Sequence, residues 1–388
     1  MTTETAAALR LRLVEQLVAE GVLHDPEVRR AAETVPREVF LGPAIYKPSS
    51  PPGVTVWTPT RRDDTPADEW LRLTYQDQTW VTQIDGVLAE EATGPVTGGS
   101  PTSSSTLPGV VLWMIEQAGV APGKRVLIIG AGTGLSTAYI CEVAAEENVT
   151  SIETDAAAAE RARKALAEIG YAPTLITADG LRGYPDRAPY DIVIAFCSMR
   201  HVPYGLLQQI ETGGTLLVTI SGWGVAHGLV RLTVEANGVA EGRFLPGYTS
   251  FMIARPHDRP AHGPFELLPG DERWSRIDPA LLDDWTGRFV AQLATPSAER
   301  LGAGAEQILL DVASGSQART RAADDGEGWT VVQRGPLNLW TAIEDSLLGW
   351  QSYGSPHLSS FGMTITPDNQ KVWLDVPHGP SWTLPLVL

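Results

Sequence analysis

Cysteine is rare in this chain of 388 residues, which contains only Cys141 and Cys197 and no C-x-x-C spacing. Such sparse thiols suit a reducing compartment rather than a disulfide-rich secreted domain, so we expect a cytoplasmic protein. The first residues also lack the basic-then-apolar order of a signal peptide. Because no run of about 18 apolar residues occurs, the sequence predicts no membrane-spanning segment.

Positive charge is also in short supply. The chain has 29 Lys and Arg residues against 46 Asp and Glu residues, which gives a net charge of −17. Nucleic-acid backbones are bound through clustered Lys and Arg, so this balance argues against a nucleic-acid partner. It suits a cationic or neutral partner, although many acidic proteins gain only solubility from such a charge. We find no constellation of residues that predicts a metal site.

What is present describes a globular protein, with a hydrophobic content of 43% and a length that allows two or more domains. The most informative stretch is residues 125–134, RVLIIGAGTG. Its first half predicts a buried strand, and residues 135–146 predict a helix. Between them, Gly130, Gly132 and Gly134 let the backbone bend sharply and approach a ligand without Cβ atoms. The helix N-terminus favours an anionic or carboxylate-bearing ligand over this glycine turn.

Two common nucleotide-binding patterns do not fit the glycine turn. The phosphate-loop pattern G-x-x-x-x-G-K-[ST] is absent, which argues against nucleoside triphosphate hydrolysis. The dinucleotide pattern G-x-G-x-x-G is absent too, because the third glycine comes one residue early. The turn therefore needs other residues to identify its ligand.

Strands and helices alternate after the glycine turn. Further strands are predicted at residues 149–153, 173–177, 190–196 and 216–221. Asp155 is placed to cap an alanine-rich helix over residues 156–169. Such a series with short connections predicts an α/β fold with a doubly wound parallel sheet, whose ligands bind beyond the carboxyl ends of the strands.

The residues before the glycine turn predict helices and an irregular segment. Apolar spacing predicts a helix over residues 5–23, and Asp25 with Pro26 begins a second helix that ends at Thr34. Residues 47–70 are rich in Pro, Ser, Thr and Asp, which indicates an ordered excursion or a mobile lid. The next patterns predict a strand, a loop and a helix, at residues 71–85, 90–105 and 108–119 respectively.

The end of the chain predicts a separate α+β domain. Antiparallel strands are expected near residues 228–235 and 239–254, and the prolines, glycines and charges of residues 256–270 indicate a linker. Residues 271–388 hold seven of the twelve tryptophans, which most often serve as core. Within them the patterns predict two strand blocks and a helix, at residues 329–333, 362–376 and 340–350.

Two acidic residues follow the second and third predicted strands. Glu153 lies where a carboxylate can bind a ribose diol. Asp179, before Gly180, is placed to accept from the exocyclic amine of an adenine. Together with the glycine turn, this is the layout of an S-adenosylmethionine pocket. The predicted cofactor-binding residues are Ile129, Gly130, Ala131, Gly132, Gly134, Glu153, Thr154, Asp179 and Gly180.

Over roughly residues 25–222 the sequence resembles the protein-L-isoaspartyl O-methyltransferase family. The matching segments are Val35-Pro-Arg-Glu-Val-Phe40, Tyr75-x-Asp77, the Ser/Thr run before Pro108, residues 126–134, Ile152-Glu153, Asp179-Gly180, Ala188-Pro-Tyr-Asp191 and Gln208-x-x-x-x-Gly213-Gly214. The Ser/Thr run at residues 102–106, the inserted loop before it and the Trp-rich C-terminal region resemble a narrower group. That group is the actinobacterial methyltransferases of ribosomal-peptide maturation, which act beside ATP-grasp (graspetide) or lanthipeptide enzymes.

The resemblance implies a class I S-adenosylmethionine-dependent methyltransferase, with a Rossmann-like fold. It implies four segments: N-terminal helices and a peptide-binding segment (1–105), the cofactor-binding domain (106–255), a linker (256–270) and a substrate-recognition domain (271–388). It places Thr106 at the active-site hydroxyl, with Ser105 and Ser104 next in line, and Asp77 at the peptide-side rim. Trp80, Val81 and His201 are the expected substrate contacts.

The narrower resemblance implies methylation of an aspartate side chain on a modified precursor peptide, followed by closure of a succinimide (aspartimide) that persists or opens to isoaspartate. The alternatives are general repair of isoaspartyl proteins and a cofactor-binding accessory protein without catalysis. Two features depart from the family. Ile128 stands where the family usually carries an acid, and residues 80–105 are longer than in the repair enzymes. The oligomeric state is not indicated by the sequence.

Overall fold

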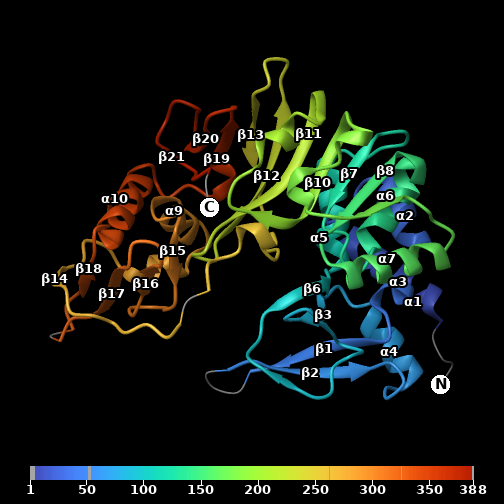
Figure 1. The fold of residues 1–388 in the computed structure, drawn as a ribbon, viewed down its shortest axis with the longest axis horizontal. Coiled ribbons are helices and arrows are strands. Elements are labelled where there is room, and N and C mark those ends of the chain that lie inside the picture. Colours follow the sequence, from blue (N-terminus) through green and yellow to red (C-terminus); the bar gives the residue numbers. More distant parts are fainter. Residues whose placement is uncertain (1–4, 51–53, 262, 325, 387–388) are drawn as a thin grey trace. The chain divides into compact units, whose positions relative to one another are not determined.

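The computed structural model describes residues 5–50, 54–261, 263–324 and 326–386. The chain divides into two compact units. The first unit contains the residues up to Phe196 and Gly205–Leu217, and the second contains Cys197–Tyr204 and the residues from Val218 onward (Figure 1). None of the helices in the described ranges has the length and apolar character of a membrane-spanning segment.

The first unit begins with three helices, α1 (Ala6–Ala19), α2 (Pro26–Thr34) and α3 (Arg37–Leu41). The predicted cap of α2 is confirmed, because the Asp25 side chain accepts from the amides of Glu27 at 2.8 Å and Val28 at 3.1 Å. A capping carboxylate satisfies amides that the first helical turn leaves unpaired. The helix therefore starts where the sequence places it.

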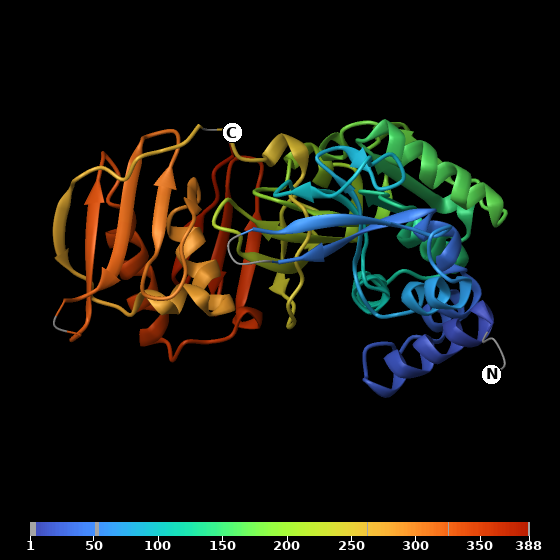
Figure 2. The same cartoon turned by 90° about the horizontal axis from the view of Figure 1, so that it is seen from below.

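A small mixed segment follows, in which the structure corrects two sequence expectations and gives the predicted excursion ordered strands. The excursion at residues 47–70 contains an antiparallel hairpin of β1 (Ala44–Ser49) and β2 (Val56–Arg61), drawn in blue in Figure 2. The strand predicted at residues 71–85 begins instead inside a helix, α4 (Ala67–Thr74), and only β3 (Trp80–Ile84) is extended. The loop predicted at residues 90–105 contains short strands. The remaining strands of this sheet are β4 (Val87–Leu88), β5 (Val96–Thr97) and β6 (Pro101–Ser105).

The predicted parallel sheet is confirmed in the first unit. Strands β7 (Val126–Ile129), β8 (Val149–Glu153), β9 (Thr174–Thr177) and β10 (Tyr190–Met199) lie in the order β9-β8-β7-β10, with β11 (Ile210–Ser221) beside β10. The pairs β8·β9, β7·β8 and β10·β7 are parallel. The helices between them are α5 (Pro108–Ala118), α6 (Leu135–Ala144) and α7 (Ala156–Glu168), and Asp155 caps α7 as predicted.

The second unit contains two antiparallel arrays. In one, β12 (His227–Val234) pairs with β13 (Ala240–Phe244), and β19 (Phe361–Ile365), β20 (Gln370–Leu374) and β21 (Ser381–Thr383) continue the array from β13. The other is a sheet of β14 (Asp271–Trp274), β15 (Ala298–Arg300), β16 (Ile308–Asp311), β17 (Ser316–Ala322) and β18 (Trp329–Arg334). The α-helices of this unit, within the described residues, are α9 (Trp285–Ala294) and α10 (Leu339–Ser352). Helix α8 (Tyr204–Leu207) begins at the unit boundary and otherwise lies in the first unit.

This arrangement differs from a C-terminal domain that starts at residue 271. Ala240 in β13 lies opposite Ile365 in β19, so strands from both sides of the predicted linker share one array. The predicted linker, residues 256–270, lies inside the second unit. Local composition does not reveal such a pairing, because the two strands are far apart in the chain.

Candidate functional site

The glycine turn after β7 has the backbone geometry that its sequence predicts. Gly130, Gly132 and Gly134 have φ values of +87°, +54° and +91°. These values lie in the region that side chains with a Cβ rarely adopt. The carbonyl of Ile152 on β8 accepts from the amides of Gly130 at 2.9 Å and Ala131 at 3.1 Å. The turn is therefore fixed to the end of the neighbouring strand.

The third glycine, Gly134, packs closely against a neighbouring helix. The helix that follows it has an uncapped N-terminus, which can bind an anion. A Cβ at Gly134 would lie 3.1 Å from the Ala162 Cβ on α7. Helix α6 starts directly after Gly134, and no side chain caps its first amides. Unpaired amides and the helix dipole make this end suitable for a carboxylate or another anion.

Glu153 ends β8 and holds the turn through its side chain. One carboxylate oxygen accepts from the Gly132 amide at 2.8 Å, and the other accepts from the Asp155 amide at 3.0 Å. The residue is only 9% exposed. Each carboxylate oxygen has a further lone pair, so the fixed group can still accept from two hydroxyls. The next residue, Thr154, is exposed.

Asp179 and Gly180 follow β9 and complete this edge of the sheet. The Asp179 side chain accepts from the Leu181 amide at 3.0 Å, which caps a short 3₁₀ turn at Gly180–Arg182. A Cβ at Gly180 would lie 2.5 Å from the Ile129 side chain, so only glycine fits there. The structure thus brings the ends of β7, β8 and β9 together, as the sequence predicts.

The hydroxyl-bearing segment lies against the glycine turn. A Cβ at Gly132 would lie 3.6 Å from the Ser104 carbonyl oxygen, which shows how closely β6 approaches. On β6, Ser103 and Ser105 are buried and Ser104 is partly exposed. Thr106, which follows the strand, is also partly exposed. The Ser105 hydroxyl has no hydrogen-bond partner among the described residues. Thr106 and Ser104 are therefore the more accessible of the three predicted hydroxyls.

Asp77 has a structural contact. Its carboxylate accepts from the Gly109 amide at 2.7 Å, and the Thr79 hydroxyl accepts from the Leu107 amide at 3.1 Å. Both contacts lie at the start of α5. Asp77 therefore acts as a cap that reaches the helix from another segment. Burial raises the pKa of Asp77, and the Gly109 amide and Arg37 oppose this shift.

The predicted substrate contacts occupy different surroundings. Trp80 is 6% exposed and packs in a cluster with Leu41, Ile45, Trp70 and Leu73, so its ring serves the core. Val81 is partly buried and lies opposite Ser104 in the β3·β6 pair. Ile128, at the position of the family's acid, is fully buried in β7.

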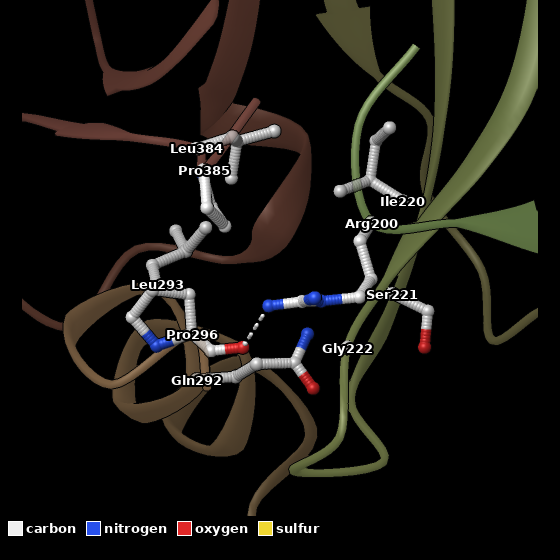
Figure 3. A pocket seen from close by; sticks show the side chains of 9 residues that line it. All are labelled: Arg200, Ile220, Ser221, Gly222, Gln292, Leu293, Pro296, Leu384 and Pro385. Atoms are coloured by element: carbon white, nitrogen blue, oxygen red, sulfur yellow. Dashed lines mark hydrogen bonds between the residues drawn. The ribbon is translucent and has the colours of Figure 1, made fainter. Parts of the chain in front are cut away.

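His201 belongs to the second unit, where its ring centroid lies 4.4 Å from that of His257. Burial, followed by the charge of Arg200, lowers the pKa of His201. Figure 3 shows the neighbouring cavity, which is about 10 Å³ and so has room for one water molecule. Arg200 crosses it and donates to the Pro296 carbonyl at 3.1 Å. Sequence reasoning did not single out Arg200.

Arg37 was also missed, apart from its place in a matching motif. It is fully buried, and its guanidinium donates to backbone carbonyls of residues 74–78 and of the hydroxyl segment. One signal was available. Residues 35–42 are apolar apart from Arg37 and Glu38, and an arginine in such a corner either buries its charge or turns it outward. The sequence favours the outward position for both charges, and the structure corrects this for Arg37.

Comparison with known proteins gives consistent matches. The family model "Protein-L-isoaspartate(D-aspartate) O-methyltransferase (PCMT)" matches residues 82–244. The chain is 33% identical over 221 residues to a protein-L-isoaspartate O-methyltransferase of Hyperthermus butylicus, covering 54% of this chain and 74% of that protein. It is 32% identical over 267 residues to protein-L-isoaspartate O-methyltransferase 1 of Rhodopseudomonas palustris, covering 66% and 91% respectively. A solved structure of a protein-L-isoaspartate O-methyltransferase superposes with a TM-score of 0.53 at 18% identity, covering 95% of this chain and all of that one.

Proposed function

This chain belongs to the protein-L-isoaspartate O-methyltransferase family, and we propose that it methylates the free α-carboxylate of L-isoaspartyl residues in peptides or proteins. It is a carboxyl O-methyltransferase with the predicted class I fold, and its cofactor is S-adenosylmethionine. What remains to be tested is the substrate and the role of each site residue.

The residues at the strand ends fit this cofactor. Glu153 is a fixed carboxylate with lone pairs left for the ribose hydroxyls. Asp179 accepts from the Leu181 amide with one oxygen, and its other oxygen lies 3.9 Å from the Arg182 guanidinium. In this proposal that second oxygen also accepts from the adenine amine. The open start of α6 suits the carboxylate of the methionine part. Ile129, Gly130, Ala131, Gly132, Gly134, Thr154 and Gly180 supply the backbone and apolar walls in this proposal.

For methyl transfer the protein mainly has to position the substrate oxygen against the methyl group. When bound, S-adenosylmethionine supplies a methyl group that is already activated on a sulfonium. The substrate oxygen must lie in line with that methyl group at about 3–3.5 Å, with water excluded. We assign this placement to the Thr106 hydroxyl, which donates to the substrate carboxylate without competing as a nucleophile. The observation that carries the proposal is the approach of the Ser104 carbonyl to Gly132, which puts the hydroxyl segment next to the cofactor site.

A second candidate is methylation of an aspartate in a modified precursor peptide. The small sheet within residues 44–105 and the second unit favour it, because both add surface to the minimal fold. The second unit does not discriminate, however. The solved structure that covers 95% of this chain is itself named a protein-L-isoaspartate O-methyltransferase. Isoaspartyl methylation is therefore our leading proposal. The accessory-protein alternative depended only on Ile128, which stands where the family usually carries an acid. In this chain Glu153 is the acid that bonds the glycine turn, so Ile128 gives that alternative little support.

Matched peptides separate the two candidates. One linear peptide would carry a single isoaspartate, a second the same sequence with aspartate, and a third the aspartyl sequence closed into a macrocycle. We expect kcat/KM for radiolabelled methyl transfer to be about 100-fold or more higher for the isoaspartyl peptide. Transfer to the aspartyl macrocycle with none to the isoaspartyl peptide would contradict the proposal and favour precursor-peptide maturation.

A further inference from the structure

Arg37 is fully buried, and its side chain bonds to no carboxylate among the described residues. All five of its hydrogen bonds end on backbone carbonyls. One terminal nitrogen donates to the carbonyls of Thr74 at 2.8 Å and Gln76 at 2.6 Å. The other donates to Gln78 at 2.8 Å and reaches the carbonyls of Ser105 and Thr106 at 3.5 Å each.

These carbonyls belong to two separate segments. Thr74 ends α4 and Gln76 and Gln78 follow it, whereas Ser105 ends β6 and Thr106 follows that strand. The first segment reaches the start of α5 at two further points, since Asp77 bonds the Gly109 amide and Thr79 bonds the Leu107 amide. Arg37 therefore lies at the centre of a brace, which we define as Arg37, Asp77, Thr79 and the backbone of residues 105–109.

The brace fixes the backbone on both sides of Thr106. The peptide group before Thr106 is held through the Ser105 carbonyl. The peptide group after it is held at both ends, through the Thr106 carbonyl by Arg37 and through the Leu107 amide by Thr79. With both flanking peptide groups held, φ and ψ of Thr106 have little freedom. A β-branched side chain then has few χ1 rotamers left, so the position of its hydroxyl is largely set.

The burial of the Arg37 charge is unfavourable for stability, which indicates that the residue serves to position the backbone. Burial lowers the pKa of Arg37 to about 10, so the side chain keeps its charge at neutral pH. A buried charge is weak evidence for stability, because apolar replacements of similar size are often neutral or stabilising. The two terminal nitrogens of Arg37 present four N–H groups to these five carbonyls, while Nε has no hydrogen-bond partner among the described residues. A lysine ammonium carries three donors on one nitrogen and cannot reach the two segments from two separate nitrogens.

We propose that Arg37 is a positioning residue for methyl transfer, which places the Thr106 hydroxyl against the substrate carboxylate through the two peptide groups that flank it. This inference rests on the proposed function. Arg37 touches neither substrate nor cofactor in this scheme. It acts on the rate of the bound complex, because a small misplacement of a reacting group costs rate more than affinity.

The first test is Arg37→Lys, which keeps the charge but loses the planar donors. We expect kcat for isoaspartyl peptide to fall by about 10- to 100-fold, with KM within about threefold and the dissociation constant for S-adenosylhomocysteine within about twofold. The matched control is Arg161→Lys, another largely buried arginine that donates to a backbone carbonyl, that of Leu41. It should retain the wild-type kcat. Equal losses of kcat in the two variants would overturn the inference.

A double-mutant cycle shows whether Arg37 acts through Thr106. Adding Arg37→Lys to Thr106→Val should change kcat by less than about twofold, because the hydroxyl that Arg37 places is already gone. A further loss as large as in the wild-type background would contradict the proposal. Thr79→Ala provides a second variant if Arg37→Lys fails to fold. Thr79 is exposed and holds the other end of the same peptide group, so its loss should also lower kcat.

Hydrogen exchange separates a failure of this inference from a failure of the proposed function. The Leu107 and Gly109 amides should exchange about tenfold faster in Arg37→Lys than in the wild type, even if no isoaspartyl peptide is methylated. The same amides should be unchanged in Arg161→Lys. Unchanged exchange in Arg37→Lys would refute the brace. Faster exchange in Arg37→Lys, together with no methylation by the wild type, would refute only the proposed function.

Discussion

Thr106 and Ser105 are neighbours with opposite surroundings. Ser105 is 1% exposed and its hydroxyl has no hydrogen-bond partner among the described residues, whereas Thr106 is partly exposed. Ser105 is the last residue of β6, and Thr106 follows the strand. The resemblance already names Thr106 first, and the burial of Ser105 gives a separate physical reason for that order.

We therefore expect Thr106→Val to lower kcat by about 100-fold while the affinity for S-adenosylhomocysteine is retained, because one hydrogen-bond donor to the developing ester is lost. Ser105→Ala should lower kcat by less than about threefold, since its hydroxyl has no bond to lose. Steady-state methylation of an isoaspartyl peptide and calorimetry with the cofactor product measure both effects. The reverse order of the two variants would show that the inward hydroxyl is the functional one.

At the residue scale, the sequence singled out the residues around the glycine turn but not the brace. The glycines, Glu153 and Asp179 carry their signal locally, because each sits at a fixed place after a strand. Arg37 carries no such signal. Its partners are backbone carbonyls about 40 to 70 positions away. Every residue type has a backbone carbonyl, so the sequence does not mark these positions as partners.

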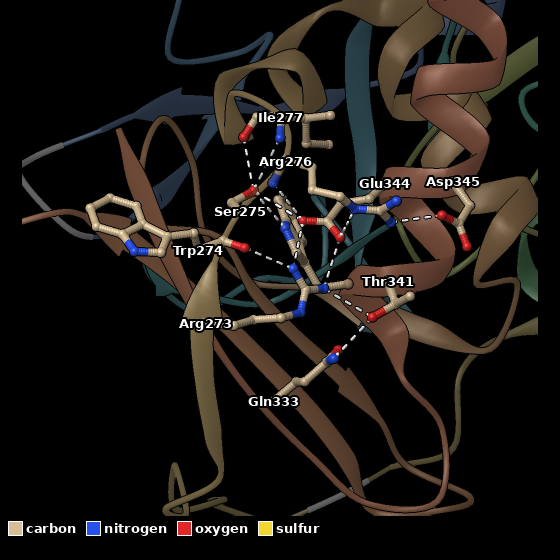
Figure 4. Close-up of polar contacts among 10 residues, drawn as sticks. Arg273, Trp274, Ser275, Arg276, Ile277, Gln333, Thr341, Glu344 and Asp345 are labelled. Carbon is tan, nitrogen blue, oxygen red and sulfur yellow. Dashed lines mark hydrogen bonds and ion pairs between the residues drawn. The ribbon is translucent and has the colours of Figure 1, made fainter. Parts of the chain in front are cut away.

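Among the elements, α10 and β14 of the second unit are joined by one carboxylate. Glu344 on α10 is fully buried and accepts from Arg273 at 2.8 and 3.0 Å and from the Arg276 side chain at 3.0 Å (Figure 4). Ser275 and the Arg276 amide also donate to it. Burial raises the pKa of Glu344, but the hydrogen bonds from Arg273 and Arg276 outweigh it, so the pKa is lowered overall.

Removal of this charge should destabilise the second unit. We expect Glu344→Gln to lower the free energy of unfolding by about 1–3 kcal/mol at pH 7, because charge-assisted hydrogen bonds to a buried carboxylate are lost while the two arginines, 34% and 46% exposed, stay hydrated. A carboxylate with a lowered folded pKa stabilises above its ordinary pKa of 4.5, and that stability is lost as the pH falls through the folded value. The difference between wild type and variant should thus be constant above pH 4.5 and shrink below it, as followed by urea unfolding.

The control is Glu272→Gln. Glu272 pairs with Arg321 at 2.9 Å, but both side chains are nearly half exposed, so its removal should leave the unfolding midpoint unchanged. A Glu344→Gln variant as stable as the wild type at pH 7 would show that the buried pair does not hold α10 to β14.

The misread elements share a physical cause. In residues 67–74, Trp70, Leu73 and Thr74 are buried at helical spacing, and Asp68 and Glu69 lie in the first turn, where acids stabilise a helix. The alternation of Leu71, Leu73 and Tyr75 also fits a strand, so the helical spacing was not recognised from the sequence. In β6, a serine-rich segment pairs with β3 although its composition resembles a loop. The extended conformation of that segment is set by its pairing with β3 rather than by the intrinsic preference of its residues.

At the scale of the whole molecule, the α/β order of strands was predictable and the extent of the units was not. Short βαβ connections fix neighbours in the parallel sheet, so the local pattern is sufficient. The array that joins β13 to β19 pairs residues more than 100 positions apart, and no local signal marks it. The Trp-rich region is therefore not an independent domain that can be removed at residue 271.

The central claim is that the cofactor lies over the glycine turn with Glu153 at its ribose and Thr106 facing its sulfur. A crystal structure of the full chain with S-adenosylhomocysteine tests this most directly. We predict ribose hydroxyls about 2.6–3.2 Å from the Glu153 carboxylate, and the Thr106 hydroxyl on the side of the sulfur from which the methyl group leaves. Cofactor density away from residues 130–134, or a Thr106 side chain directed away from the sulfur, would contradict the account.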